Sequence, residues 1–137
     1  MKIIALRGAG GKGKTPTLKK VYDNLLKHGN SVDICEDLSN GDFRAILKNS
    51  MGDIIGIVSQ GDYVIGHCSV KNHLDWCESK HCVKVVCACT LGPHKEKIQA
   101  YIASFPDHFF IDKTIESDSK LQDSVNENDA AIIENYL

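Results

Sequence analysis

The sequence predicts an α/β fold, in which a mainly parallel sheet of about five strands lies between two layers of helices. Short apolar runs typical of strands alternate along the chain with stretches whose apolar residues recur at helical spacing. Residues 53–59 are apolar on both faces, as a central parallel strand is. The 137 residues, of which 42% are hydrophobic and 25% charged, show no linker and no internal repeat. We therefore expect one domain that spans residues 1–137.

Five apolar runs are predicted to be strands, because each is short and is bounded by residues that favour turns or helix ends. They are residues 2–6, 31–36, 53–59, 83–90 and 109–111. Strands that alternate with helices in this way pair mainly in parallel.

The first two helices are predicted from apolar side chains that share one face. The first helix follows the strand at 2–6, and Gly29 is placed to end it. Its apolar positions, at i, i+3, i+4 and i+7, are Leu18, Val21, Tyr22 and Leu25. Ser39 or Asn40 can cap a second, short helix. Its buried side would consist of Phe43, Ile46 and Leu47.

Two further helices and a terminal one are predicted in the second half of the chain. A third helical stripe is formed by Val70, Leu74 and Cys77. Pro93 suits the first turn of a fourth helix, and Pro106 stops it. Residues 112–128 are polar and are interpreted as a surface connection, whereas the apolar residues within 131–137 suggest a terminal helix that docks on the sheet.

The charge and the apolar runs exclude several classes of protein. The net charge of −2 argues against a general nucleic-acid binder. No stretch approaches the ~18 apolar residues of a membrane span, and the N-terminal run is too short for a signal peptide. We therefore expect a cytoplasmic protein whose six cysteines are reduced. Residues 1–30 contain seven Lys or Arg against Asp23 alone, so an anionic ligand is expected at this end.

One motif in this basic segment carries specific chemistry. Residues 8–15 match the pattern G-x-x-x-x-G-K-[ST], between a predicted strand and a predicted helix. Glycines let the backbone fold closely around a polyphosphate, with its N–H groups facing the anion. We expect Lys14 to reach the β and γ phosphates and Thr15 to give its hydroxyl to Mg²⁺. Lys12 either adds charge at the phosphates or is a solvated lysine. The predicted nucleotide-binding residues are Gly8, Ala9, Gly10, Gly11, Lys12, Gly13, Lys14 and Thr15.

In this loop and in its order of strands and helices, the chain resembles the P-loop NTPase superfamily. The resemblance implies a three-layer P-loop domain that binds a nucleoside triphosphate with Mg²⁺. The loop looks most like those of the MinD-like and signal-recognition-type subgroup, although the lysine that often follows the first glycine there is Ala9 here. ATP is favoured over GTP, because the nearest string to a guanine-reading Asn-Lys-x-Asp motif, residues 72–75, lacks the lysine.

The resemblance also implies an acidic residue that holds Mg²⁺ at the end of a strand beside the loop. In the family pattern an aspartate directly follows the apolar run, but here Ser59 stands in that place and the first carboxylate is Asp62. Asp62 is either a displaced Mg²⁺ ligand with a catalytic role or a turn residue. Glu36 and Asp37 either hold an acceptor substrate or form a solvated strand end.

Other polar residues carry weaker signals. Gln60 either orients a water molecule or is polar surface. His73, Cys77 and His81 have the spacing i, i+4, i+8, which could approximate a zinc site. The same positions continue an apolar stripe and contain no C-x-x-C or H-E-x-x-H pattern, so a partly buried side of a helix is favoured.

Two classes of function stay open. The first is an ATPase or a small kinase that hydrolyses the γ phosphate or transfers it to a small acceptor. The second is a nucleotide-dependent regulatory or interaction module with little turnover. The chain has only two arginines, Arg7 and Arg44, and little length is left for a lid. A protein partner or a second copy of the chain is therefore expected to complete the site.

Overall fold

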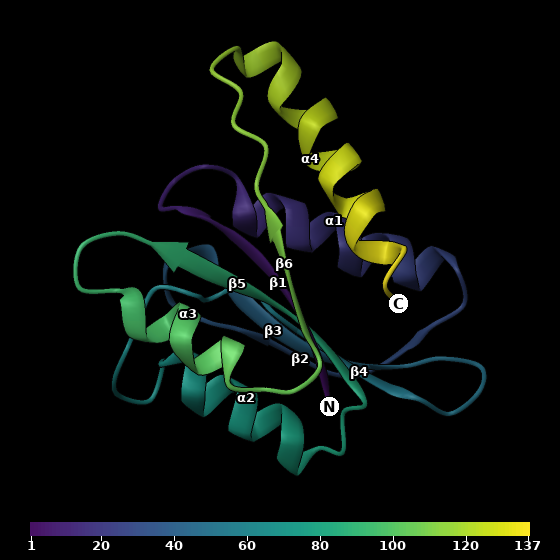
Figure 1. Ribbon diagram of the computed structural model, residues 1–137. Helices are drawn as coiled ribbons and strands as arrows, with labels where there is room; N and C mark the ends of the chain where they lie inside the picture. Colours follow the sequence, from purple (N-terminus) through teal and green to yellow (C-terminus); the bar gives the residue numbers. More distant parts are fainter.

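The computed structural model describes residues 1–137 and shows an α/β fold built on a six-stranded, mostly parallel mixed sheet with four helices (Figure 1). The strands are β1 (Lys2–Ala9), β2 (Ser31–Asp37), β3 (Phe43–Lys48), β4 (Ile54–Val58), β5 (Lys84–Leu91) and β6 (His108–Asp112). The helices are α1 (Lys14–Lys27), α2 (Val70–Ser79), α3 (Glu96–Ala103) and α4 (Ser119–Glu134), and a short 3₁₀ turn, η1, covers Ser39–Gly41.

The strand order across the sheet is β2-β3-β4-β5-β1-β6. β1 pairs in parallel with β5 and β6, and β4 pairs in parallel with β5. β3 runs antiparallel to both of its neighbours, β2 and β4. The carboxyl ends of β1, β4, β5 and β6 therefore meet at one edge of the sheet, and β3 begins at that same edge.

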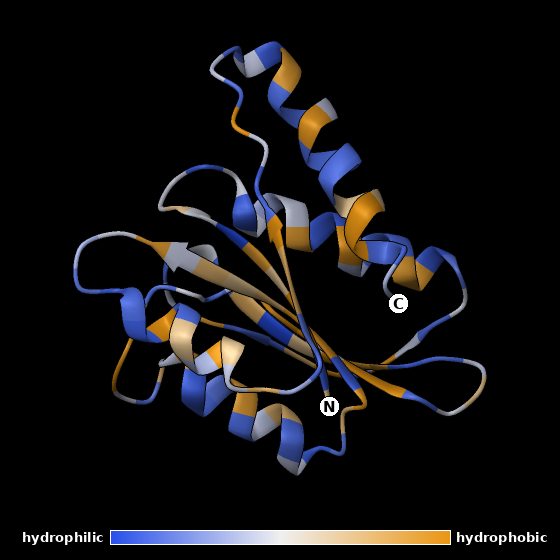
Figure 2. Ribbon diagram, viewed as in Figure 1, coloured by the Kyte–Doolittle hydropathy of each residue, from blue (hydrophilic) through white to orange (hydrophobic).

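Helices cover both faces of the sheet (Figure 1). On one face α1 packs on the strands and α4 packs on α1, in a cluster that includes Leu18, Val21, Ala130 and Ile133. On the other face α2 and α3 contribute Val70, Leu74, Ile98 and Ile102 to a second cluster. Hydrophobic residues are accordingly concentrated on the strands and on one side of each helix (Figure 2). None of the helices combines the length and the apolar character that crossing a membrane requires.

The helix predicted after Ser39 is wrong, because residues 43–48 form the strand β3. Phe43, Ala45 and Leu47 pack in one core cluster, whereas Ile46 packs in the cluster on the opposite face. Side chains that alternate between two buried faces have the period of a strand. Over so short a run, the spacing of the apolar residues fits a helix as well as a strand. Only the burial of side chains on both faces identifies the strand.

A tight turn between β3 and β4 explains why this segment forms a hairpin. The side-chain Oδ1 of Asn49 accepts hydrogen bonds from the backbone N–H groups of Met51, at 3.0 Å, and Asp53, at 2.9 Å. Gly52 has a φ of 85°, a value that glycine adopts without strain. The chain therefore reverses here and places β3 beside β4, which adds a sixth strand to the five that were predicted.

The predicted surface connection over 112–128 is only partly correct, because α4 begins at Ser119. The side chain of Asp118 accepts a hydrogen bond from the backbone of Lys120 and caps the helix. The buried residues of α4 include Asn126 and Asp129, so its first half has no apolar stripe to be recognised. The other predicted strands and helices are confirmed, with shifts of a few residues at their ends.

Candidate functional site

The glycine-rich loop, residues 8–15, joins the end of β1 to the start of α1. Gly11 and Gly13 adopt φ values of 71° and 94°, in the left-handed region. Gly13 is the N-cap of α1, and the Oγ1 of Thr17 donates to its carbonyl at 2.7 Å. No side chain caps the helix, so its first N–H groups are available to a ligand. The loop can therefore bind an anion at the positive end of the helix dipole.

Lys14 is folded back onto this loop. Its ammonium donates to the carbonyl oxygens of Gly8, at 2.9 Å, and Ala9, at 2.7 Å. The residue is only 6% exposed, and burial lowers the pKa of Lys14 while the negative charge of Asp62 opposes that shift. A buried cation held only by neutral carbonyl oxygens can exchange them for a stronger, anionic partner.

A buried carboxylate, Asp42, accepts a hydrogen bond from the predicted Mg²⁺-binding hydroxyl. The Thr15 Oγ1 donates to Asp42 Oδ1 at 2.8 Å, and the Ser59 Oγ donates to the same oxygen at 2.9 Å. Asp42 lies directly before β3, which starts at the edge where β1 and β4 end. Sequence reasoning missed Asp42 because it placed this residue inside a helix. No local signal identifies it, because the apolar spacing over residues 43–48 fits a short helix as well as a strand.

Asp62 lies in the same cleft. Its Oδ1 accepts a hydrogen bond from the Thr90 Oγ1, and its carbonyl accepts one from the Lys95 ammonium. Thr90 is the register partner of Gly8 on the neighbouring strand, so Asp62 reaches the glycine-rich loop through β5. β4, the strand that precedes Asp62, does not pair with β1, because β5 lies between them. The structure nevertheless brings Asp62 to the cleft, as the sequence predicted.

The cleft has a volume of about 620 Å³ and two walls. The glycine-rich loop forms its base, and the first wall carries Asp42, Ser59, Asp62 and Thr90. The second wall comes from residues 113–117 and from α4, through Gln122, Val125 and Asn126. In Figure 1 this second wall is the yellow-green strand end and helix beside the purple loop.

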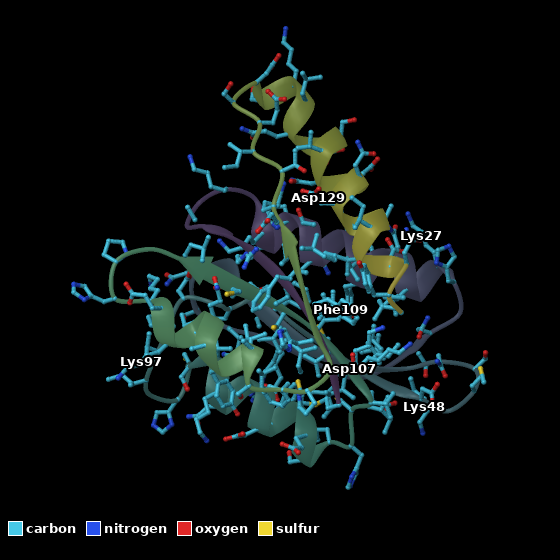
Figure 3. All side chains as sticks on the ribbon, viewed as in Figure 1. Lys27, Lys48, Lys97, Asp107, Phe109 and Asp129 are labelled. Atoms are coloured by element: carbon cyan, nitrogen blue, oxygen red, sulfur yellow. The ribbon has the colours of Figure 1, made fainter.

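A buried ion pair fixes the second wall against the loop. The Lys113 ammonium lies 2.9 Å from Asp129 Oδ2, and the two side chains are 1% and 2% exposed. Asp129, labelled on α4 in Figure 3, also accepts from the backbone N–H of Thr114 at 2.9 Å and from its Oγ1 at 2.7 Å. A Cβ atom at Gly8 would lie only 3.1 Å from the Lys113 Cβ, so the loop and the ion pair are in close contact.

Other predicted site residues lie outside the cleft. Glu36 accepts a hydrogen bond from the Arg44 Nε at 2.7 Å on the antiparallel pair β2 and β3, and Asp37 is exposed at the end of β2. Gln60 is neither at the cleft nor on the surface. It is 1% exposed, and its side-chain oxygen lies 2.8 Å from the His73 Nε2. Gln60 is thus a core residue that holds His73, and a role in orienting water does not fit this position.

His73, Cys77 and His81 do not converge on one point. His73 contacts Gln60, Cys77 is buried beside Cys82 at Gly56, and His81 is exposed. No group of three or more His, Cys, Asp or Glu side chains in the structure is placed to hold a metal ion. A zinc site formed by these three residues is therefore not supported.

Comparison with known proteins gives no relative from which a function could be transferred. No protein-family model, no curated protein and no solved structure matches the chain. Functional conclusions therefore depend on the geometry of the cleft.

Proposed function

We propose that this protein binds a nucleoside triphosphate together with Mg²⁺ in the cleft above residues 8–15, as a three-layer P-loop domain does. The observation that carries the proposal is the hydrogen bond from Thr15 to the buried carboxylate of Asp42, beside the buried ammonium of Lys14. A cation, a hydroxyl and a carboxylate at the N-terminus of a helix are the groups that a magnesium triphosphate requires.

The phosphates would bind to the glycine-rich loop. Free N–H groups at the start of α1 and the helix dipole favour a negative charge there. The Lys14 ammonium would exchange its bonds to the carbonyls of Gly8 and Ala9 for phosphate oxygens. The gain for a buried cation is larger with an anionic acceptor than with a neutral one.

The residues beside the loop fit Mg²⁺ as part of this ligand. Magnesium takes oxygen ligands and is commonly held by one or two protein groups in addition to phosphates and water. Thr15 and Asp42 supply a hydroxyl and a carboxylate that already touch, at 2.8 Å, and Asp62 supplies a second carboxylate in the cleft. When bound, the ion would neutralise charge on the phosphates. Asp42 would thus share with Thr15 and Asp62 the binding of Mg²⁺ that we predicted for those two residues.

Both arginines of the chain are engaged in ion pairs outside the cleft, which favours slow turnover over rapid catalysis. Arg7 is paired with Asp112 at 2.7 Å, and Arg44 is paired with Glu36 at 2.7 Å. Neither lines the cleft, so the chain brings no arginine of its own to the phosphates. We therefore favour a nucleotide-dependent module whose ATPase or phosphotransfer activity is completed by an arginine from a partner protein or a second copy.

A thermal-stability screen tests the proposal. The melting temperature is measured with MgATP, MgGTP and each nucleotide in EDTA, for wild type, Lys14→Ala and the control Lys27→Ala. Lys27 is an exposed lysine at the other end of α1. A ligand at a hundredfold its Kd adds roughly 2.7 kcal/mol of stability, a shift of several degrees. We expect MgATP to stabilise wild type and Lys27→Ala, but not Lys14→Ala.

Two results would refute nucleotide binding at this cleft. One is that no nucleotide stabilises the wild-type chain at millimolar concentration. The other is that Lys14→Ala, folded as judged by its unliganded melting curve, is stabilised as much as wild type.

A further inference from the structure

Two cysteines at the end of α2 have their sulfur atoms side by side in the core. Cys77 lies in the last turn of the helix, and Cys82 lies between the helix and β5. Both cysteines are free thiols, and they are 0% and 6% exposed. A Cβ atom at Gly56 on β4 would lie 2.8 Å from the Cys77 Sγ and 3.2 Å from the Cys82 Sγ. The two sulfur atoms therefore share the space that the missing side chain of Gly56 leaves.

The backbone at the end of α2 fixes this pairing. The N–H of Cys82 donates to the carbonyl of Cys77 at 3.1 Å. The N–H of His81 donates to the carbonyl of Glu78 at 3.0 Å, and His81 has a φ of 64°, in the left-handed region. These two hydrogen bonds and this φ define a Schellman motif, in which the residues at the positions of Cys77 and Cys82 commonly form a side-chain contact. The folded backbone thus holds the two thiols together.

The two thiols differ in acidity and in access. The Cys77 thiol donates a hydrogen bond to the Cys82 sulfur, which lowers the pKa of Cys82 and raises the pKa of Cys77. Cys82 lies between two exposed residues, His81 and Val83, whereas Cys77 is fully covered. The thiolate is the form of cysteine that attacks an oxidant. Cys82 is therefore the thiol that reacts first.

From this arrangement we propose that Cys77 and Cys82 form a redox-active dithiol, which a hydroperoxide oxidises to a disulfide in the folded protein. With hydrogen peroxide, the Cys82 sulfur attacks one oxygen, the O–O bond breaks, and a sulfenic acid and one water are formed. The Cys77 sulfur then attacks the Cys82 sulfur, gives up its proton and displaces the oxygen as a second water. Two thiols and one peroxide thus give one disulfide and two waters.

This site is separate from the cleft. Cys82 precedes β5, whereas the cleft lies at the end of that strand, where Thr90 lines it. Oxidation of the dithiol therefore does not depend on the binding of a nucleotide, and the two proposals can fail independently.

Peptide mapping of the intact chain tests the proposal. The folded protein is treated with hydrogen peroxide, the remaining thiols are alkylated, and the protein is digested with trypsin without a reducing agent. Trypsin cleaves after Lys80, so Cys77 and Cys82 fall in separate peptides, residues 72–80 and 81–84. We expect these peptides to be joined, at the sum of their masses less two hydrogen atoms, and to separate on reduction.

Variants assign the order of the two steps. In Cys77→Ser no second thiol is present, so the sulfenic acid on Cys82 should persist and be trapped by dimedone. In Cys82→Ser the remaining thiol is buried, and we expect no dimedone adduct on Cys77. The matched control is a double variant, Cys35→Ser with Cys68→Ser, which removes the two cysteines that are not buried. It should form the joined peptides as wild type does.

Three results would overturn the proposal. One is that peptides 72–80 and 81–84 stay separate while the exposed Cys35 is oxidised. Another is that dimedone labels Cys77 in Cys82→Ser as strongly as it labels Cys82 in Cys77→Ser. The third is a lower melting temperature for the oxidised chain than for the reduced one. Because the sulfur atoms already lie together, the bond should form without distorting the fold, and the melting temperature should stay the same or rise.

Discussion

Removing Asp129 should strongly destabilise the protein, because its carboxylate is buried and paired. Its carboxylate accepts three hydrogen bonds, one from the Lys113 ammonium and two from the backbone and hydroxyl of Thr114, at 2.7 to 2.9 Å. Asp129→Ala leaves a lysine whose side chain is 1% exposed without an anion. Breaking a buried ion pair by removing one partner costs about 3–5 kcal/mol. That is a large part of the roughly 5–15 kcal/mol by which a domain is stable.

Urea-induced unfolding followed by circular dichroism measures this free energy. The control is Asp123→Ala, whose carboxylate pairs with Lys20 but is 76% exposed, so its removal should leave the midpoint near that of wild type. A double variant, Lys113→Met with Asp129→Leu, should recover most of the loss, because apolar pairs of similar volume commonly replace buried ion pairs without cost. If the free energy of unfolding of Asp129→Ala is within about 1 kcal/mol of that of wild type, the ion pair does not fix α4 against the loop.

The remaining predictions concern the cleft and the core. Asp42→Asn keeps the size of the side chain but removes the charge beside Thr15, so we expect it to weaken nucleotide binding by about tenfold in Mg²⁺ and much less in EDTA, as measured by titration in each buffer. An equal loss in both buffers would argue against a role in holding the ion. Burial, aided by the positive charge of Arg44, lowers the pKa of His73 from 6.5 to about 4. Below pH 6.5 the unfolded chain takes up the proton first, so wild type should lose roughly 3 kcal/mol of stability between pH 6.5 and pH 4 relative to His73→Gln. Parallel unfolding curves of the two proteins across this range would show that His73 does not titrate in this way.

The sequence predicts those parts of the site that consist of consecutive residues. The loop over 8–15 is a local pattern whose conformation depends on its own glycines, and its lysine and threonine are fixed by their place in it. Asp62 was predictable as the first carboxylate after a recognisable strand. These inferences depend only on local sequence, namely on the strand and the turn next to each residue.

Asp42 and Asn126 could not be predicted in the same way, for two physical reasons. Asp42 reaches Thr15 only because β3 runs antiparallel, and the apolar spacing of six residues does not distinguish a reversed strand from a short helix. Asn126 belongs to a helix whose buried face is partly polar, so hydropathy gives no stripe to follow. In the sequence, a buried polar residue cannot be distinguished from a solvated one, because burial depends on neighbours that are distant along the chain.

The reversed strand also explains how the cleft can hold a carboxylate where the sequence has Ser59. In a wholly parallel sheet, only residues that follow a strand lie at the carboxyl edge. An antiparallel strand adds the residue that precedes it, and here that residue is Asp42. Ser59 occupies the strand end and donates its hydroxyl to Asp42 at 2.9 Å, which aims the carboxylate at Thr15. The cleft thus holds the carboxylate of Asp42, which is oriented by a hydroxyl from the end of the adjacent strand.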